Sequence, residues 1–241
     1  GKKDNHKLAL YKIQQAKLKI QNSDYVGARI IIDKALNLEQ DLAPAYYFLA
    51  KTYSEESNIE YEKALKVENE DSSSLSNKKE YNQFLEEAKK ILSKAIPLWI
   101  HFVEISPDEA WLVLPSLKDA LFVLNRYSEL ENILVELNNN FPNNNEIIAS
   151  LADYYSHKGE IDKALESLNE AYNNGDTSLL IRLITVKLKM QKSQNEAISK
   201  ELDNMITDLV KDQRYQFMNK KSSNNDMKWL LEDTKINFTW D

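Results

Sequence analysis

The chain has 241 residues, a formal net charge of -7 and 42% hydrophobic residues, with only 4 Gly and 5 Pro. So few helix breakers favour long helices over a turn-rich sheet, and the acidic charge argues against a general nucleic-acid-binding protein, which needs a basic surface. The sequence contains no cysteine, which excludes disulfides, thiol catalysis and thiolate metal sites.

The N-terminus begins with Gly1 and the basic run GKKDNHK. Two explanations stay open. The run is the basic flank of an excised anchor or signal sequence, or it combines a remnant of cloning with a frayed polar end of the first helix. No stretch approaches the roughly 18 apolar residues of a membrane span. We therefore expect membrane contact only through a segment that would precede Gly1.

The first predicted helix runs from about Asp4 to Gln21, because apolar residues recur there at helical spacing. Asn22 and Ser23 interrupt the pattern, and Asp24 can cap a second helix that extends to Leu38. These two helices make a first antiparallel pair.

The stretch from Asp24 to Tyr53 has the residue pattern of a helical repeat. Small residues stand where two helices must approach closely, and large ones stand where the space between helices must be filled. The small residues are Ala28, Ala35 and Ala50, and the large ones are Ile32, Leu38, Tyr46, Leu49 and Tyr53. A second pair begins near Ala43, with Pro44 in the first helical turn, and its first helix extends to about Glu56.

The repeat spacing fails after Glu56. The run VENEDSSSLSNKK has no apolar periodicity and predicts a mobile loop. We therefore expect an insertion over residues 57–87 that contains a short extra helix. The helix of the interrupted repeat resumes near Glu80 and ends at Ser106. The residues that restore the repeat spacing are Ala95, Trp99 and Phe102.

Beyond Pro107 the repeat pattern is regular. The predicted helices span residues 108–124, 127–140, 144–158, 161–174, 177–192 and 195–211. The run FPNNN, at residues 141–145, ends one helix and caps the next. Pro97 and Pro115 lie inside helical patterns, so each should kink its helix or mark its first turn.

The tail over residues 212–241 differs from the repeats. Short runs with aromatic and β-branched residues (RYQFMN, MKWLL and KINFTW) alternate with polar turns. This pattern predicts a small β-hairpin folded on the last repeat, with Trp229 and Trp240 as its anchors.

The second pair resembles a tetratricopeptide repeat (TPR). The residues that carry the resemblance are Tyr46, Leu49, Ala50 and Tyr53, followed by a second-helix pattern. The order of features, helical repeats followed by a short tail, is similar to the lipopolysaccharide assembly protein B family of membrane-anchored TPR proteins. The resemblance implies a single N-terminal membrane anchor and an adaptor role that brings a partner to a membrane-bound complex.

In that family the tail is a rubredoxin-like metal knuckle with the pattern Tyr-x-Cys-x2-Cys, a spacer and Trp-x-Cys-x2-Cys. Tyr215 and Trp229 stand in matching places here. The four ligand positions hold Phe217, Lys220, Leu231 and Thr234. None of these can replace a thiolate, so the resemblance implies that the metal site has been lost.

The whole pattern predicts an all-α, TPR-like superhelix of about five helix pairs with a small C-terminal β-hairpin. We divide the chain into N-terminal TPR-like helices (1–56), the insertion with its mobile loop (57–87), further TPR-like pairs (88–211) and the tail (212–241).

No enzyme motif stands out: GxxxxGK[ST], GxGxxG, GxSxG and HExxH do not occur. His101 and Glu104 can share a helix face, a spacing seen in some metal sites, but a hydrolytic zinc site needs a third ligand. A partly exposed helix histidine is the ordinary explanation. Neighbouring carboxylates such as Glu55 and Glu56 are typical of solvated helices. We expect no enzyme activity, no cofactor and no metal.

In a repeat superhelix the first helix of each pair lines the concave groove, and its outward positions form the recognition surface. By the register above, the partner-binding positions are Ile13, Lys17, Tyr47, Lys51, Trp111, Lys118, Asp153 and His157. Tyr47 and Trp111 are the most informative, because large aromatic residues are enriched at interface hot spots. Packing against the insertion or the tail is the alternative explanation for each.

We therefore expect a non-enzymatic scaffold or adaptor that binds another protein through its concave face. The resemblance adds a bacterial cell-envelope setting, an N-terminal anchor and a membrane-associated partner. The alternative is a structural protein that self-associates through its N-terminal helix and its tail to form homo-oligomers.

Overall fold

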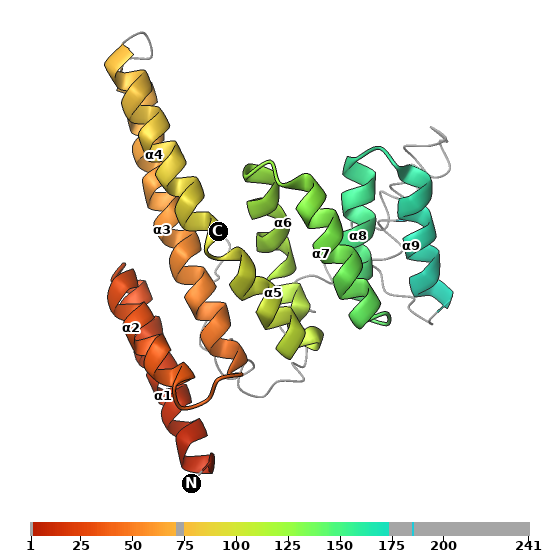
Figure 1. Ribbon diagram of the computed structural model, residues 1–241, viewed down its shortest axis with the longest axis horizontal. Helices are drawn as coiled ribbons and strands as arrows, with labels where there is room; N and C mark the ends of the chain where they lie inside the picture. Colours follow the sequence, from red (N-terminus) through yellow and green to blue (C-terminus); the bar gives the residue numbers. More distant parts are fainter. Residues whose placement is uncertain (1, 71–74, 174–184, 186–241) are drawn as a thin grey trace, which may run out of the picture.

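The computed structural model describes residues 2–70, 75–173 and 185, and every element in this part of the chain is helical (Figure 1). The elements are α1 (Lys2–Gln21), α2 (Tyr25–Leu36), α3 (Ala43–Glu70), α4 (Leu75–Ser93), α5 (Ile96–Ile105), the 3-10 helix η1 (Pro107–Leu112), α6 (Leu114–Val123), α7 (Tyr127–Asn140), α8 (Asn145–His157) and α9 (Ile161–Asn173). The predicted all-α class is confirmed. The helices predicted over 177–192 and 195–211 and the β-hairpin predicted over 212–241 lie outside the described residues.

The helices pack against their neighbours in chain order. α1 lies against α2, α3 against α4, and α8 against α9, while α3 also contacts both helices of the first pair and α5. Figure 1 shows the α1–α2 pair at one end, the α3–α4 hairpin beside it and α5 to α9 following, with the tip of the α3–α4 hairpin extending beyond the other helices. This stacking of successive pairs is the architecture that the repeat pattern predicts.

Two clusters of apolar side chains form most of the core. One fills the space between α1, α2 and α3, and the other fills the space between α3, α5, η1, α6, α7 and α8. Tyr47, Tyr53 and Leu98 are partly buried and contact both clusters, so the core is continuous across α3. The small residues predicted at close helix approaches, Ala28, Ala35 and Ala50, have no exposed surface.

Asp24 caps α2, as the sequence predicts. Its Oδ1 accepts a hydrogen bond from the backbone N–H of Gly27 at 2.9 Å. A Cβ atom at Gly27 would lie 2.4 Å from the other carboxylate oxygen of Asp24. Glycine at this position therefore lets the capping carboxylate fold over the first turn of α2.

The prediction of a mobile loop over VENEDSSSLSNKK, residues 67–79, is wrong where the structure describes this run, since residues 67–70 end α3 and residues 75–79 begin α4. α3 does not stop near Glu56 but continues to Glu70, and α4 begins at Leu75, five residues before the predicted start at Glu80. Residues 71–74 lie outside the described part. The division of the chain into four segments stays a prediction.

The helical arm formed by these extensions needs few large apolar residues. It buries the small side chains of Ala64 and Ala88, and the Ser57 hydroxyl donates a hydrogen bond to the Ala88 carbonyl at 2.8 Å. Ion pairs three residues apart, such as Lys63 with Glu60 at 2.6 Å, stabilise its exposed side. Residues 67–79 contain only two large apolar residues, Val67 and Leu75, so no apolar periodicity marks the end of α3 and the start of α4, which is why the pattern predicted a loop there.

Two predicted helices are each divided in the structure. The helix expected from Glu80 to Ser106 breaks after Ser93, and the one expected over 108–124 becomes η1 followed by α6. Pro97 and Pro115 lie in the first turns of α5 and α6. A proline ring clashes with the carbonyl four residues earlier, so each proline ends the preceding element and starts a new one.

Candidate protein-binding surface

Two of the predicted recognition residues, Ile13 and Lys17, lie on the buried side of α1. Ile13 has no exposed surface and belongs to the cluster shared by α1, α2 and α3, so the prediction that it contacts a partner is wrong. Lys17 is only 8% exposed. α1 carries a second apolar stripe, Leu8, Tyr11 and Leu18, on its exposed side. Hydrophobic periodicity alone could not tell which stripe faces inward.

Tyr47 and Lys51 lie one turn apart on α3. The Tyr47 ring is 5.1 Å from the Phe48 ring and 6.1 Å from the Phe102 ring between centroids. Burial, and then the negative charge of Glu55, raise the pKa of the Tyr47 hydroxyl. Lys51 pairs with Glu55 at 3.6 Å. Tyr47 therefore contributes chiefly to the packing between the two core clusters.

Trp111 lies in η1 and is half-buried. Its indole Nε1 donates a hydrogen bond to Glu109 Oε2 at 3.1 Å, and Glu109 has no exposed surface. A buried carboxylate needs donors of this kind. The indole N–H therefore already has a partner within the chain.

Lys118, Asp153 and His157 are the predicted residues that the structure brings together. Lys118 on α6 forms an ion pair with the Asp153 carboxylate on α8. His157 lies one turn after Asp153, with Nδ1 2.9 Å from the Asp153 carbonyl oxygen and 3.5 Å from its carboxylate oxygen Oδ1. Because a carbonyl only accepts hydrogen bonds, Nδ1 carries the proton in the shorter contact.

Two aromatic residues that the sequence analysis did not select complete this region. The Phe122 ring on α6 lies 5.5 Å from the His157 ring and 5.4 Å from the Tyr127 ring, which begins α7. We call Lys118, Phe122, Tyr127, Asp153 and His157 the α6–α8 surface. Phe122 follows Lys118 by four residues and so shares its helix face, which is the signal that could have identified it.

The turn between α6 and α7 sets the position of Tyr127. Asn125 adopts a left-handed backbone conformation with φ 55°, which asparagine tolerates better than most residues, and its side-chain oxygen accepts a hydrogen bond from the Tyr127 hydroxyl at 3.1 Å. Arg126 then makes two hydrogen bonds to Glu129, at 2.6 and 2.5 Å, across the first turn of α7.

The α6–α8 surface offers aromatic area beside charges that are paired with one another. Such a surface suits recognition, because aromatic rings give large contact area and the rim charges add orientation. No cluster of three His, Asp or Glu side chains suited to a metal occurs among the residues that the structure describes. His101, the other histidine considered for a metal, lies with Nδ1 3.1 Å from Glu104 Oε2 and packs edge-on against Tyr46.

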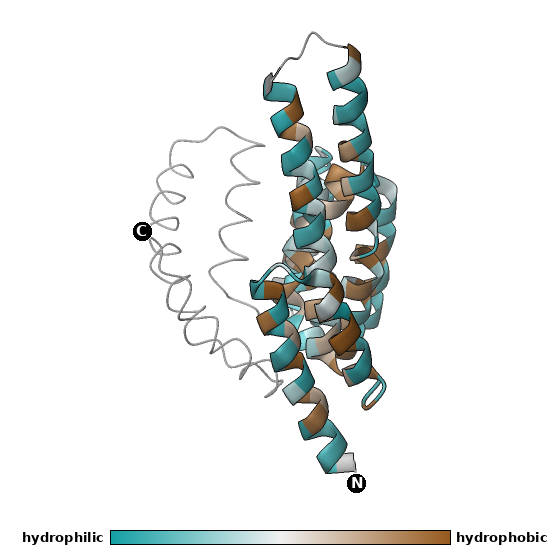
Figure 2. Cartoon of the chain, turned by 90° about the vertical axis from the view of Figure 1, so that its left-hand side faces the viewer, coloured by the Kyte–Doolittle hydropathy of each residue, from teal (hydrophilic) through white to brown (hydrophobic). Residues whose placement is uncertain are grey.

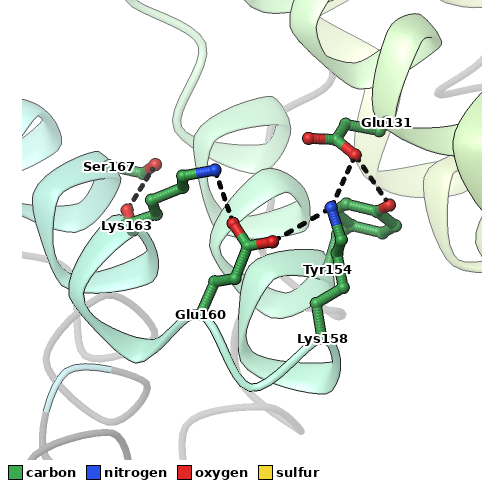
Figure 3. Close-up of polar contacts among 6 residues, drawn as sticks. All are labelled: Glu131, Tyr154, Lys158, Glu160, Lys163 and Ser167. Carbon is green, nitrogen blue, oxygen red and sulfur yellow. Dashed lines mark hydrogen bonds and ion pairs between the residues drawn. The ribbon is translucent and has the colours of Figure 1, made fainter.

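A network of charged side chains joins neighbouring helices around the end of α8 (Figure 3). Lys158 Nζ lies 2.9 Å from Glu131 Oε2 and 3.0 Å from Glu160 Oε1, and the Tyr154 hydroxyl donates to Glu131 at 3.0 Å. Lys163 pairs with the second oxygen of Glu160 at 2.5 Å. The network therefore joins α7, α8 and the start of α9.

We expect this network to weaken in acid. Hydrogen bonding from Lys158 lowers the pKa of Glu131, and hydrogen bonding from Lys163 and then Lys158 lowers that of Glu160, below their ordinary value of 4.5. A carboxyl whose pKa is lower in the folded state stabilises that state above about pH 4.5 and loses this contribution as the pH falls through its folded pKa. The protection factors of the amide hydrogens in α9, which divide the intrinsic exchange rate at each pH by the observed rate, should therefore fall below about pH 4.5 more in the wild type than in Lys158→Met. An equal acid response in both chains would contradict this.

No protein-family model matches the sequence, and no curated protein matches it. Solved structures that are similar to it include YrrB, PilF and TTC0263. YrrB, a TPR protein with an unusual peptide-binding site, is 16% identical, with 81% of this chain and 84% of YrrB covered and a TM-score of 0.40. PilF of Pseudomonas aeruginosa is 15% identical, with 97% and 99% covered and a TM-score of 0.36. TTC0263, a thermophilic TPR protein of Thermus thermophilus, is 20% identical, with 79% and 100% covered and a TM-score of 0.36.

These TM-scores are too low for one superposition to place the helices of those proteins on this chain, so no site residue is transferred from them. The fold class rests on the described helices themselves: an all-α array in which successive antiparallel helices pack in chain order.

Proposed function

We propose that the protein is a non-enzymatic TPR-type scaffold that binds another protein on the α6–α8 surface. The observation that carries the proposal is the meeting of Phe122, Tyr127 and His157 from three consecutive helices, next to the pair of Lys118 and Asp153. Rings from three consecutive helices that converge on one exposed area make a preformed contact site, because the scaffold has already fixed their positions.

We extend the proposal to a bacterial cell-envelope adaptor with a membrane-associated partner. The support for this extension is the resemblance in the order of features, helical repeats followed by a tail in which Tyr215 and Trp229 have the spacing of the metal knuckle. With Phe217 and Leu231 at two of the four ligand positions, the tail would be held by apolar packing rather than by metal.

The test is capture of the partner from the native cell by the wild-type chain and by the double variant Tyr127→Ala, His157→Ala. Tyr127 is 46% exposed, so its replacement should leave the fold intact. Loss of a central aromatic contact should lower the amount of captured partner about tenfold or more. Circular dichroism of both chains checks that the fold is retained.

A matched control is Tyr61→Ala on the α3–α4 hairpin, since Tyr61 is also exposed, by 45%, but lies far from α8 in the sequence and on another pair of helices. We expect capture by Tyr61→Ala to equal that of the wild type. Undiminished capture by the double variant would exclude the α6–α8 surface as the binding site.

A further inference from the structure

The outward side of α1 carries an apolar stripe that no described element covers. Leu8 is 45% exposed, and Tyr11 and Leu18 are each 60% exposed. With Gln15, which is also exposed, these residues follow one another at spacings of three and four and therefore share one helix face. The opposite face, with Ala9, Ile13, Ala16 and Ile20, is buried in the core.

Lysines flank this stripe on both sides. At 100° per residue, Lys7 falls on one side of it and Lys12 and Lys19 fall on the other, and Lys19 Nζ lies 2.8 Å from the Asp24 carboxylate. α1 contains six lysines and one aspartate, whereas the whole chain has a net charge of -7. Figure 2 looks onto the α1–α2 end of the molecule, where apolar and polar segments alternate along the outermost helices. The basic charge is therefore concentrated at one end of an acidic protein.

We propose that the outward face of α1 binds the surface of an anionic lipid bilayer. Leu8, Tyr11 and Leu18 would enter the boundary between headgroups and acyl chains, and the flanking lysines would extend to lipid phosphates on either side. None of the helices that the structure describes is long and apolar enough to cross a bilayer, so this contact is one of a helix lying on the surface.

The lysines beside the stripe favour an anionic bilayer, rather than a second copy of the chain, as the occupant of the outward face of α1. Two α1 helices placed face to face would bring lysine flanks against lysine flanks, which opposes pairing. An anionic surface instead attracts the lysines, and it orients the basic end of the molecule toward it. This inference is independent of the α6–α8 surface, which lies on other helices, so either proposal can fail without the other.

The test uses the 241-residue chain with vesicles of phosphatidylcholine alone or mixed equally with phosphatidylglycerol. The wild type should sediment with the mixed vesicles, bind phosphatidylcholine poorly, and lose binding as salt shortens the Debye length from about 10 Å to about 3 Å. Tyr11→Gln with Leu18→Gln should weaken binding about tenfold or more, and so should Lys3→Glu with Lys7→Glu. Tyr61→Gln, at a tyrosine of similar exposure, should bind as the wild type does.

Because the chain has no cysteine, a single environment-sensitive dye can report the contact site. A dye on Tyr11→Cys should shift to the blue on mixed vesicles, and a dye on Leu75→Cys, at the far end of the α3–α4 hairpin, should not. Equal binding to both vesicle types, or equal dye responses at the two positions, would overturn the proposal. Two other results would also overturn the proposal. One is a dimer in solution that dissociates when Tyr11 and Leu18 are both replaced with glutamine. The other is a crosslink from position 11 to another protein, together with a dye at position 11 that does not respond to vesicles.

Discussion

Replacing Phe102 with alanine should lower the free energy of unfolding by about 3–5 kcal/mol. Phe102 has no exposed surface, lies in the larger core cluster and contacts the Tyr47 ring. Its removal leaves a cavity where α5 meets α3, the helix shared by both clusters. A domain of ordinary stability has about 5–15 kcal/mol in total, so this one change removes about a fifth of it or more. Urea denaturation followed by circular dichroism measures the loss.

Phe102→Leu is the matched control, because leucine keeps much of the volume and all of the apolar character. It should cost no more than about 1.5 kcal/mol. Tyr47→Phe should be close to the wild type, and Tyr47→Ala should resemble Phe102→Ala, since the contribution of Tyr47 comes from its ring. A Phe102→Ala loss below about 1 kcal/mol would contradict the assignment of Phe102 to the packed core between α5 and α3.

Some helices that bury large residues on one side could be predicted from the sequence to within about two residues at each end. α7 and α8 are examples: Leu130, Leu134 and Leu137 in α7, and Ile147, Ile148 and Leu151 in α8, are buried at helical spacing. The outer half of the α3–α4 hairpin could not be predicted in this way. Between residues 67 and 79 the only large apolar residues are Val67 and Leu75, so the end of α3 and the start of α4 give no periodic hydrophobic signal.

The candidate site could be predicted only where a helix has one apolar face. α1 has two, and choosing between them requires knowing where α3 lies, so Ile13 was assigned to the wrong side. The partners Lys118 and Asp153 were both selected from the helical register, but their ion pair joins residues 35 apart in the sequence. Phe122 belongs to the candidate binding surface because its ring contacts those of Tyr127 and His157. These contacts depend on how α6, α7 and α8 pack, which the sequence pattern of one helix does not show.

Asn144→Ala should cost about 2–3 kcal/mol of stability, because one side chain makes two kinds of contact. Its Oδ1 caps α8 by accepting hydrogen bonds from the backbone N–H groups of Glu146 at 3.1 Å and Ile147 at 3.2 Å. Its Nδ2 donates to the carbonyl of Pro107 at 2.7 Å, which joins the start of α8 to η1. Alanine removes the cap and the bridge together, and thermal or urea unfolding reports the total.

Asn144→Asp separates the two contributions. The carboxylate can still cap α8 and interacts favourably with the helix N-terminus, but it cannot donate to the Pro107 carbonyl. We therefore expect aspartate to cost about 1 kcal/mol, less than alanine, with the difference measuring the cap. If aspartate and alanine cost the same, the bridge to η1 rather than the cap would hold α8 in place, and the position of Asp153 and His157 would depend on η1.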